Sequence, residues 1–466
     1  MLTPHRLAPT ILREYDVRGT VGQDLTADDA RALGGAFGTT VRQAGGSRVV
    51  VGYDGRTHSP LLEAALIEGL IRAGVNVERV GLGPTPMLYF AAHTTKADGG
   101  VMVTGSHNAS DQNGFKMLIG KHLPTGGSVY GEAIKALAEI AAKGIYASGA
   151  GSVTERPVRA AYIARLLQEA EGLRPMHVAW DLGNGAAGVI VPDLVKQLPG
   201  THTLLFPEVD GLFPNHHPDP TVPSNLADLQ EAVQHQSCLL GLAFDGDADR
   251  LGAVDDKGRI LAGDQILALL ATEVLKERPG ATIISEVKAS QVLYDTITAY
   301  GGVPLMWKTG HSLIKQKMIE TGAPLAGEMS GHIYFADRYD GFDDGIYAAL
   351  RLLGLVSRSG KTLAELYDAL PQRMTTPELR FPVDEAKKFA IVETVRKNLE
   401  AAGADMVTVD GVRVTTPEGW WLLRASNTQA ILVARAESED SVGLERLKEA
   451  LTTALKAAGV TPPSAL

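Results

Sequence analysis

Short apolar strands that end in polar, glycine-containing loops recur along this chain, and this recurrence constrains the fold more than any other feature. Residues 101–103 form one such strand and lead into Thr104-Gly105-Ser106-His107-Asn108; residues 240–244 form another and lead into Asp245-Gly246-Asp247-Ala248-Asp249-Arg250. Segments with helical periodicity separate the strands, and one of them begins after Thr26, which can cap a helix. Alternating strands and helices indicate α/β layers, in which loops at the carboxyl ends of strands are available for a site.

The pattern divides the 466 residues into three α/β units and a C-terminal segment of a different type. Beyond residue 371 the predicted strands are grouped and flanked by two helices, which is typical of a small α+β domain. We place the domains at residues 1–152, 153–258, 259–371 and 372–466. The predicted fold class is α/β: three successive related α/β domains with mixed sheets and a smaller C-terminal α+β domain, around a central cleft to which each domain contributes one loop.

Composition excludes several classes of protein. The 44 Lys and Arg residues and the 54 Asp and Glu residues give a formal net charge of −10, which disfavours a general binder of nucleic acid or of anionic membranes. The single cysteine, Cys238, lies in an apolar run and cannot form an internal disulfide. No apolar stretch approaches the roughly 20 residues of a membrane helix, and no secretory signal is recognisable. We expect a soluble cytoplasmic protein, a monomer or homodimer, without a nucleic-acid or membrane partner.

Three carboxylates at alternate positions, Asp245, Asp247 and Asp249, indicate a cation site. Gly246 is expected to let the backbone curl so that all three point at one centre. Oxygen ligands suit Mg²⁺ or Ca²⁺ better than zinc. An EF-hand loop is rejected, because its sixth position would be Arg250 instead of glycine.

Three further loops carry groups suited to a phosphorylated sugar. Ser106 follows a buried strand on a tight turn, where an exposed hydroxyl can act as a nucleophile or phosphate carrier, although a serine in a turn is ordinarily only a local hydrogen-bonding residue. Gly327-Glu328-Met329-Ser330-Gly331-His332 offers partners for sugar hydroxyls and an imidazole for proton transfer. Arg424-Ala425-Ser426-Asn427-Thr428 offers a guanidinium, hydroxyls and an amide for a dianionic phosphate.

A glycine-rich turn leaves a second class of function open. Gly183-Asn184-Gly185-Ala186-Ala187-Gly188 follows a predicted strand and matches the dinucleotide-binding fingerprint, with Glu208 at the expected distance beyond it. A dinucleotide-dependent oxidoreductase is therefore the alternative from another class, although it leaves the three aspartates, Ser106 and the Arg424 loop without roles. A P-loop before Lys361 is excluded, because it needs glycine where Leu355 stands.

The four polar loops, in this order, resemble the motifs of the α-D-phosphohexomutase superfamily, and specifically of its bacterial phosphomannomutase/phosphoglucomutase group. The resemblance covers essentially the whole chain, and it accounts for the Gly183 turn, since the family has a similar stretch that binds no nucleotide. It implies a Mg²⁺-dependent phosphomutase, an isomerase of carbohydrate metabolism, that interconverts hexose 1-phosphate and hexose 6-phosphate. The reaction would pass through a phosphoserine and a hexose 1,6-bisphosphate, with glucose or mannose 1,6-bisphosphate as intermediate and activator.

The resemblance also implies roles for individual residues. Ser106 would be the phosphoserine, and together with Asp245, Asp247 and Asp249 it would hold Mg²⁺. Further catalytic roles would fall to Arg18, Lys116, Arg250 and His332, of which Lys116 and His332 are candidate proton carriers. The substrate would be bound by Tyr15, Lys288, His311, Glu328, Ser330, Arg424, Ser426, Asn427 and Thr428, the last four gripping the phosphate that is not being transferred.

Two loops depart from the family pattern, at three positions. Ala109 stands where proline is common, so the Ser106 loop is expected to be less rigid while activity survives. Gln429-Ala430 replaces a frequent acidic residue and proline, which bears on the placement of the phosphate loop. Met329 favours the mannose/glucose group. Phosphoglucosamine mutase is the alternative within the same fold, and a non-catalytic sugar-phosphate binder is a third hypothesis.

Overall fold

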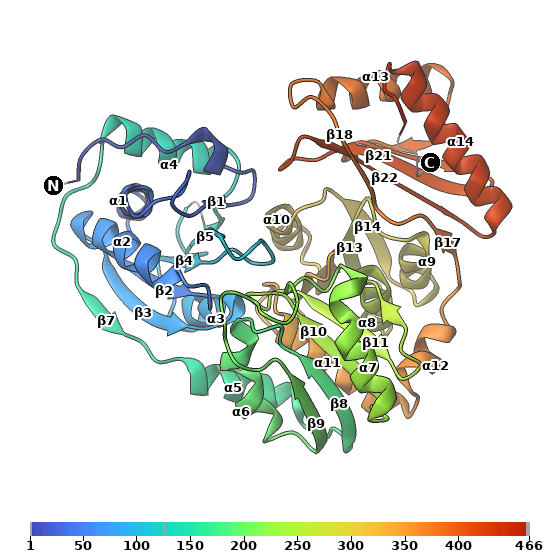
Figure 1. Ribbon diagram of the computed structural model, residues 1–466, viewed down its shortest axis with the longest axis horizontal. Helices are drawn as coiled ribbons and strands as arrows, with labels where there is room; N and C mark the ends of the chain where they lie inside the picture. The colour runs from blue at the N-terminus through green and yellow to red at the C-terminus, as the bar shows by residue number, and fades with distance from the viewer. Residues whose placement is uncertain (1, 125, 463–466) are drawn as a thin grey trace.

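Four β-sheets with their helices form the frame of the molecule. The computed structural model describes residues 2–124 and 126–462. The four units follow one another along an arc, from the N-terminal unit in blue to the C-terminal unit in red (Figure 1). Three sheets mix parallel and antiparallel strands and the fourth is antiparallel, so the predicted fold class is confirmed.

The first sheet has the order β1-β5-β4-β2-β3-β7, with β6 added to β5. Its strands are β1 (Val17–Thr20), β2 (Arg48–Tyr53), β3 (Asn76–Leu82), β4 (Gly99–Val103), β5 (Gln112–Ile119), β6 (Gly127–Ser128) and β7 (Val153–Glu155). Its helices are α1 (Ala27–Gln43), α2 (Ser59–Arg72), α3 (Thr85–Thr94) and α4 (Glu132–Lys143). Thr26 caps α1 as predicted, in a capping box with Asp29. β7 pairs with β3 although it lies beyond the boundary at residue 152, which stays a prediction.

The two middle sheets repeat this plan with fewer strands. The second, in the order β12-β11-β10-β8-β9, contains β8 (Met176–Asp181), β9 (Gly200–Leu205), β10 (Leu240–Phe244), β11 (Leu251–Asp255) and β12 (Ile260–Leu261), with α5 (Arg159–Leu167), α6 (Val191–Val195) and α7 (Ala227–His235). The third, β14-β13-β15-β16, contains β13 (Thr282–Glu286), β14 (Val303–Trp307), β15 (Leu325–Gly327) and β16 (Ile333–Phe335). Helices α8 (Gly263–Glu277), α9 (Gln291–Ala299), α10 (His311–Thr321), α11 (Gly345–Ser359) and α12 (Leu363–Asp368) accompany it.

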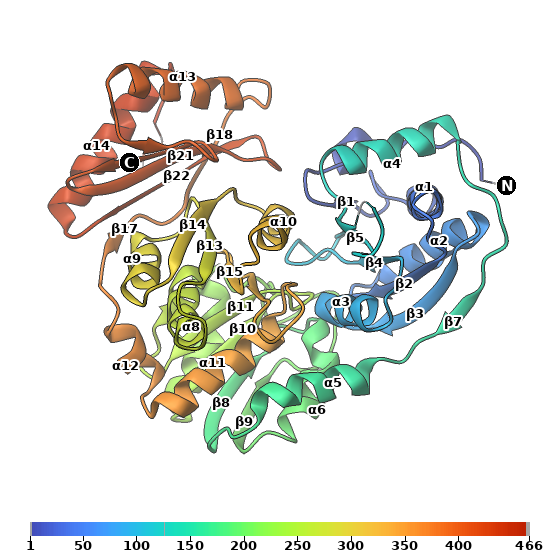
Figure 2. The same ribbon diagram turned by 180° about the vertical axis from the view of Figure 1, so that it is seen from behind.

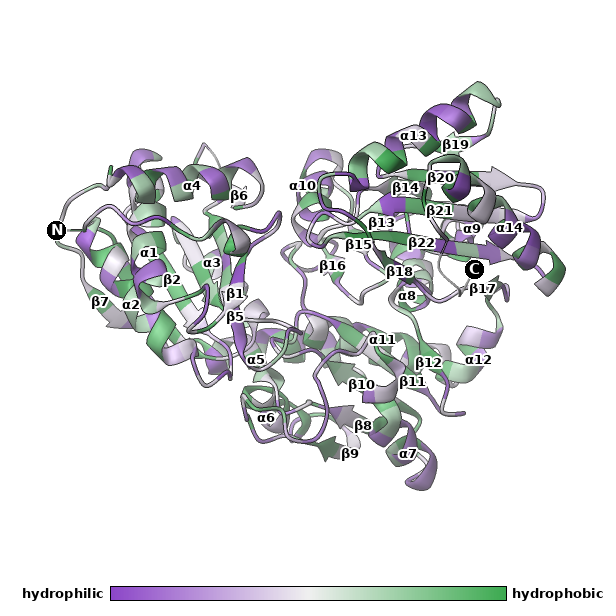
Figure 3. Ribbon diagram, turned by 45° about the horizontal axis from the view of Figure 1, so that its top comes forward, coloured by the Kyte–Doolittle hydropathy of each residue, from purple (hydrophilic) through white to green (hydrophobic). Residues whose placement is uncertain are grey.

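The C-terminal sheet has the order β17-β22-β21-β20-β19, with β18 also paired to β22. Its strands are β17 (Met374–Thr375), β18 (Leu379–Pro382), β19 (Met406–Val407), β20 (Val412–Thr416), β21 (Gly419–Ala425) and β22 (Ile431–Ser438). The helices α13 (Lys388–Ala401) and α14 (Ser441–Ala457) pack on it, with Val395, Leu447 and Leu451 against Trp421 and Leu423. Figure 3 shows the hydrophobic residues along β22 and the hydrophilic ones on α13.

One hydrophobic core joins the two middle domains to part of the first. It runs from Phe90 on α3 through Trp180 on β8 to Leu267 on α8 and Tyr347 on α11, all of them buried. The second and third domains therefore share one continuous core, which α3 of the first domain also enters. Cys238 is buried, as expected. None of the described helices combines the length and apolar character needed to cross a bilayer.

In every sheet, the loop that carries predicted site residues joins two neighbouring antiparallel strands. The β4–β5 loop carries Ser106, the β10–β11 loop Asp247, the β15–β16 loop Glu328 and the β21–β22 loop Ser426. The four loops are therefore structural counterparts, each at the carboxyl end of a strand.

Candidate functional site

Ser106 lies under the wall of the main cleft, with a left-handed backbone (φ 50°) that is uncommon outside glycine. Its N–H donates to Thr104 Oγ1 at 2.8 Å, and its hydroxyl donates to Asp245 Oδ2 of the second domain at 2.9 Å. Ser106 is only 1% exposed, so the hydroxyl expected to be exposed is buried, because the Asp245 loop covers it. Its neighbours His107 and Asn108 line the cleft.

Arg56 holds the Ser106 loop in place through the main chain. Its fully buried guanidinium donates to the carbonyl oxygens of Ser106, Asn108, Ala109 and Gln112. Asp54 accepts hydrogen bonds from Arg56 Nε at 3.2 Å, from Thr104 Oγ1 at 2.8 Å and from the Gly105 N–H at 3.1 Å. The carbonyl of Ala109 is thus held by Arg56, although no proline ring stiffens that position. The sequence analysis missed Arg56 and Asp54, although they directly follow a strand, the signal that led to the other loops.

The structure brings Asp245, Asp247 and Asp249 together as predicted. One carboxylate oxygen of each lies within 4.8 Å of the others. Lys116 Nζ lies 2.7 Å from Asp247 Oδ2 and also pairs with Asp249. Burial lowers the pKa of Lys116, but the Asp247 and Asp249 carboxylates outweigh it and hold that pKa well above its ordinary value. Lys116 is therefore a protonated counter-ion at neutral pH.

The triad fits a hard divalent cation. Asp247 Oδ1 and Asp249 Oδ1 are buried and accept no hydrogen bond from any described residue. Burial, and then the charges of Asp247 and Asp249, hold the pKa of Asp245 well above its usual range. Lys116 and the Arg250 guanidinium, whose Nε lies 3.7 Å from Asp245 Oδ2, face three carboxylates. A bound cation would be coordinated by the two unpartnered oxygens and would offset the excess of negative charge.

The turn of the aspartate loop differs from expectation. The residue with a left-handed backbone is Ala248 (φ 57°) and not Gly246. Glycine is needed at 246 for another reason: a Cβ atom there would lie 2.4 Å from the carbonyl oxygen of Ser106. The glycine lets the loops of the first and second domains touch.

The main cleft has a volume of about 410 Å³, and all four domains line it. Twelve predicted site residues lie in its wall: Tyr15, Arg18, Arg250, Lys288, His311, Glu328, Ser330, His332, Arg424, Ser426, Asn427 and Thr428. The other five, Ser106, Lys116 and the three aspartates, are buried and do not line it. Six Lys and Arg side chains against four Asp and Glu side chains line this cleft, in a molecule of net charge −10. That local excess of positive charge suits a dianion.

Tyr15 links three domains across the cleft. Its hydroxyl donates to the carbonyl oxygen of Thr309 at 2.7 Å and accepts from Asn427 Nδ2 at 2.7 Å. Burial raises the pKa of Tyr15 above its ordinary value, so the phenol stays neutral. Asp410 supports the same region, because one of its oxygens accepts from Arg424 Nε at 3.1 Å and from the Thr309 N–H at 3.0 Å.

The phosphate-loop residues are preset by local hydrogen bonds. Ser426 Oγ accepts from the N–H groups of Thr428 at 3.3 Å and Gln429 at 3.2 Å. The carbonyl oxygen of Gln429 accepts from Lys388 Nζ at 3.1 Å, so this departure from the family pattern leaves the loop tied down.

The third domain presents a carboxylate and an ammonium group. Glu328 accepts hydrogen bonds from the Tyr334 hydroxyl at 2.6 Å and the Gly310 N–H at 3.2 Å, which fixes the orientation of its carboxylate. Lys288 Nζ lies 2.9 Å from Glu378 Oε2 of the C-terminal domain. Burial lowers the pKa of Lys288, but Glu286 and Glu378 outweigh it and raise that pKa, so Lys288 enters the cleft charged.

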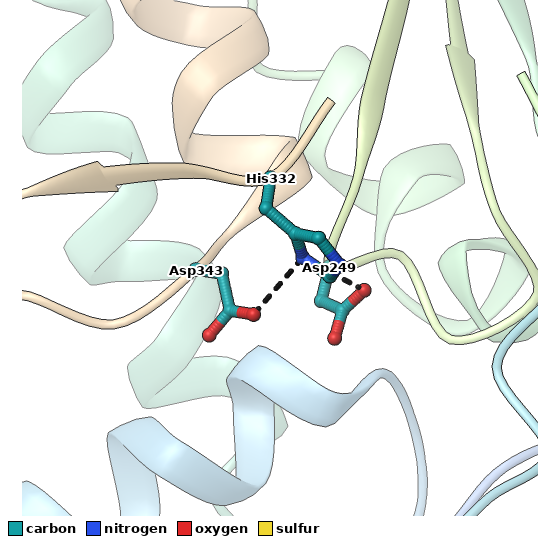
Figure 4. A group of neighbouring side chains, drawn as sticks. All are labelled: Asp249, His332 and Asp343. Carbon is teal, nitrogen blue, oxygen red and sulfur yellow. Dashed lines mark ion pairs between the residues drawn. The ribbon is translucent and has the colours of Figure 1, made fainter. Parts of the chain in front are cut away.

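His332 lies between two carboxylates, as Figure 4 shows. Its Nδ1 is 3.0 Å from Asp343 Oδ2 and 3.5 Å from Asp249 Oδ1, and its Nε2 accepts from Arg250 Nε at 3.0 Å. Burial raises the pKa of Asp343, but Lys315 and His332 outweigh it and hold that pKa well below its usual range. The ionised Asp343 therefore orients the His332 ring, a contact that sequence spacing did not reveal.

The glycine-rich turn at 183–188 does not form a nucleotide site. A Cβ atom at Gly185 would lie 2.9 Å from the carbonyl oxygen of Gly246, and the N–H of Ala186 donates to that oxygen at 2.9 Å. The helix that follows, α6, has only five residues, and the Glu208 carbonyl accepts from Asn184 Nδ2 at 2.9 Å. The turn supports the aspartate loop, which argues against the oxidoreductase alternative.

Comparison with known proteins places all four units in one family. The profiles for phosphoglucomutase/phosphomannomutase α/β/α domains I, II and III match residues 9–147, 160–258 and 262–374, and the profile for its C-terminal domain matches residues 378–454. A phosphomannomutase/phosphoglucomutase of Pseudomonas aeruginosa is 46% identical over 98% of both chains. A phosphoglucomutase of Neisseria gonorrhoeae is 44% identical over 94% of this chain and 95% of its own.

A solved structure agrees with these relatives. The crystal structure of a phosphoglucomutase/phosphomannomutase family protein from Burkholderia thailandensis has a TM-score of 0.90 and 42% identity, and the match covers 97% of this chain and 98% of that one.

Proposed function

Because this chain belongs to the phosphoglucomutase/phosphomannomutase family, we infer that it is a phosphomutase that interconverts hexose 1-phosphates and hexose 6-phosphates. One observation carries the inference to particular residues: the Ser106 hydroxyl lies 2.9 Å from Asp245, at the edge of the buried triad. A hydroxyl in this position can carry a phosphoryl group next to a bound cation.

Asp245, Asp247 and Asp249 would hold Mg²⁺ beside Ser106. When bound, the ion supplies charge neutralisation for the phosphoryl group. Arg18 and Arg250 add positive charge from the first and second domains. Arg18 is itself anchored, because its Nη1 donates to Asn108 Oδ1 at 2.7 Å and its other terminal nitrogen pairs with Asp16.

We assign proton acceptance to His332 Nε2, whose lone pair becomes available when the Arg250 Nε–H that it now accepts turns to the phosphoryl group. Transfer from phosphoserine breaks the bond between phosphorus and Ser106 Oγ, forms a bond from phosphorus to the sugar oxygen, and releases the hydroxyl proton of the sugar. Lys116 is already protonated and paired with two carboxylates, so it stabilises charge and does not accept this proton. His332 lines the cleft, and the ionised Asp343 would stabilise the imidazolium that forms.

The remaining lining residues would bind the substrate end that does not react. Glu328 and Ser330 would bind sugar hydroxyls, and Arg424, Ser426, Asn427 and Thr428 would grip the distal phosphate. Tyr15, Lys288 and His311 complete that wall. The hexose 1,6-bisphosphate must turn end for end before the second transfer, so the phosphate loop has to accept either phosphate. Glucose or mannose 1,6-bisphosphate would therefore also activate an unphosphorylated enzyme.

The curated relatives favour glucose and mannose phosphates, because their names include both sugars or glucose alone. We keep phosphoglucosamine as the alternative substrate. We also retain a cytoplasmic monomer or homodimer as part of the proposal, which light scattering on the purified protein would test for its oligomeric part.

The experiment is a coupled assay with Mg²⁺, catalytic glucose 1,6-bisphosphate and, in turn, glucose, mannose and glucosamine 1-phosphates. We expect 6-phosphate product from the first two sugars. Ser106→Ala should abolish turnover and phosphorylation of the protein by the bisphosphate, read by intact mass, whereas Ser110→Ala in the same loop keeps both. Turnover of none of the three sugars would refute the proposal, and full activity of Ser106→Ala would remove Ser106 from its role.

A further inference from the structure

A second cavity, which we call the interdomain cavity, lies between the first and third domains. Its volume is about 370 Å³, and its lining residues come from α3, from the β5–β6 connection and from α10 and the loop near residue 340. Figure 2 shows α10 facing the β5–β6 connection from the other side of the molecule, and β6 contacts α10. None of the described residues that line this cavity is a predicted site residue.

The walls of the interdomain cavity are mainly apolar. The apolar lining residues include Ala92 on α3, Leu118 and Ile119 on β5, Ile319 on α10, and Phe342. Pockets of a few hundred cubic ångströms with apolar walls and a few polar groups are the usual form of small-molecule sites.

Lysines outnumber carboxylates in the lining of the interdomain cavity. Lys96, Lys121 and Lys315 line the cavity, against one carboxylate, Asp340. Among the described residues, neither Lys96 nor Lys121 has a carboxylate partner; Lys121 Nζ donates only to the main-chain carbonyl of Asp340, at 3.1 Å. Burial lowers the pKa of Lys121, and Lys315 lowers it further against the opposing effect of Asp340. Lys96 and Lys121 are nevertheless exposed, so their two ammonium groups lie at the rim of the cavity, beside its apolar walls.

We propose that the interdomain cavity binds a small organic anion that carries an apolar ring or chain. The apolar walls would hold the ring or chain, and Lys96 and Lys121 would pair with the anionic group. This inference does not depend on the proposed mutase function.

Lys315 connects the interdomain cavity to the candidate active site. Its Nζ lies 3.0 Å from Asp343 Oδ1, and the other oxygen of Asp343 is 3.0 Å from His332 Nδ1. An anion that draws Lys315 toward the cavity would loosen Asp343 and the histidine ring that it orients. We therefore expect occupancy to slow turnover, and this second part rests on the proposed function.

The test uses 8-anilinonaphthalene-1-sulfonate, an aromatic monoanion whose fluorescence rises in apolar surroundings, and its uncharged analogue N-phenyl-1-naphthylamine. The full-length protein should bind the sulfonate saturably at one tight site and the neutral analogue about tenfold more weakly or worse. In Lys96→Glu/Lys121→Glu, affinity for the sulfonate should fall by about tenfold or more. Ile319→Trp, which fills the cavity without changing charge, should weaken both probes.

Two controls locate the site. Lys135→Glu/Lys143→Glu on the exposed face of α4 makes the same charge change, and Arg424→Ala removes a cation of the main cleft; both should keep the affinity for the sulfonate. Equal binding of the two probes, or unchanged affinity in both cavity variants, would overturn the inference. Saturating sulfonate should lower kcat several-fold. Binding without any mutase activity would refute the proposed function alone, and activity without binding would refute the interdomain site alone.

Discussion

Arg56 restrains the Ser106 loop through its carbonyl oxygens, including that of Ala109, where no proline ring stiffens the chain. The ammonium group of lysine has three donors and lacks the planar guanidinium of arginine, so it cannot donate to four carbonyl oxygens at once. We therefore expect Arg56→Lys to lower kcat by about tenfold to a hundredfold with little change in KM, because a misplaced nucleophile affects the chemical step more than binding. Steady-state kinetics with glucose 1-phosphate would measure both constants.

Arg48→Lys is the matched control, since Arg48 also donates to main-chain carbonyls, those of Thr95 and Lys96, at a place outside the cleft. A rise in KM at constant kcat in the Arg56 variant, or an equal loss in both variants, would contradict a positioning role.

Lys116 acts as an internal counter-ion for the triad, so its removal should lower the stability of the protein most when Mg²⁺ is absent. Breaking a buried pair by removing one partner costs about 3–5 kcal/mol, because the remaining charges are left uncompensated. Lys116→Met should therefore lower Tm strongly in a chelating buffer, and Mg²⁺ should restore more of the lost Tm than it adds to the wild type.

Lys288→Met serves as comparison, because Lys288 is buried between Glu286 and Glu378, away from the triad. Lys288→Met should also have a lower Tm, but Mg²⁺ should raise that Tm by no more than it raises the Tm of the wild type. Identical responses of the two variants to Mg²⁺ would show that the triad does not bind the ion.

At the scale of single residues, the sequence pointed to groups that end a strand in a recognisable motif. The triad and most of the cleft residues come from such motifs, whereas Tyr15 and Arg18, which lie before and within β1, were expected only from the family resemblance. Arg56, Asp343 and Asp410 were not predicted, because their roles depend on how the chain folds back. Arg56 donates to carbonyls some fifty residues away, and Asp410 accepts from the N–H of Thr309, 101 residues away. Asp343 meets His332 because the chain returns after β16. Ser106 was also expected to be exposed, and only the docking of a second domain explains its burial.

Among the elements, α11 begins at a capping residue that titrates. Asp344 accepts from the Tyr347 N–H and from the hydroxyls of Tyr162 and Tyr339, each at 2.8 Å. Burial raises the pKa of Asp344 from 3.8 to about 6. The folded state thus binds the Asp344 proton more tightly than the unfolded state does. Protonated Asp344 therefore contributes its full stabilisation below about pH 4, and this contribution is lost as the pH rises through about 6.

Asp344→Asn keeps the cap and removes the titration. The Tm of the variant relative to wild type should therefore rise between about pH 4 and pH 7.5, with a change in free energy on the order of 3 kcal/mol at most. Calorimetry across this range would measure it. Asp440→Asn, at the exposed cap of α14, is the control, and a difference in Tm independent of pH in the Asp344 variant would refute the assignment.

Element positions were largely predictable, whereas their arrangement was not. The strands predicted at residues 101–103 and 240–244 match β4 and β10 closely, and the helix predicted after Thr26 matches α1, because apolar period and capping are local properties. The order of strands within each sheet depends on pairing between distant segments. The equivalence of the four site loops became visible only when β5, β11, β16 and β22 proved to be antiparallel to the strand before each loop.

At the scale of the whole molecule, the hydrogen bonds of the Tyr15 hydroxyl link the first, third and C-terminal domains. Each lost hydrogen bond is worth about 1 kcal/mol, so Tyr15→Phe should raise KM for hexose phosphates by about fivefold to thirtyfold. The connection between α12 and β17, residues 369–373, should also be cleaved faster in limited proteolysis.

Tyr146→Phe removes a comparable hydroxyl, which donates to the Ala141 carbonyl at 3.3 Å within the first domain. It should change neither KM nor the rate of cleavage. If Tyr15→Phe affected kcat alone, Tyr15 would act in the chemical step and not in linking the domains.

Tyr15 and Asn427, which share a hydrogen bond, are separated by 412 positions in the chain. Ser106 and the aspartate loop that its hydroxyl contacts both lie before residue 251. On a ribosome that adds about 5–20 residues per second, the nucleophile and the aspartate triad exist on the order of ten seconds to half a minute before the phosphate loop has been made. A chain that ends before residue 424 therefore carries the nucleophile and the three carboxylates but not the loop that would hold the distal phosphate. Translation reaches the groups for the chemical step first and the groups for the non-reacting end of the substrate last.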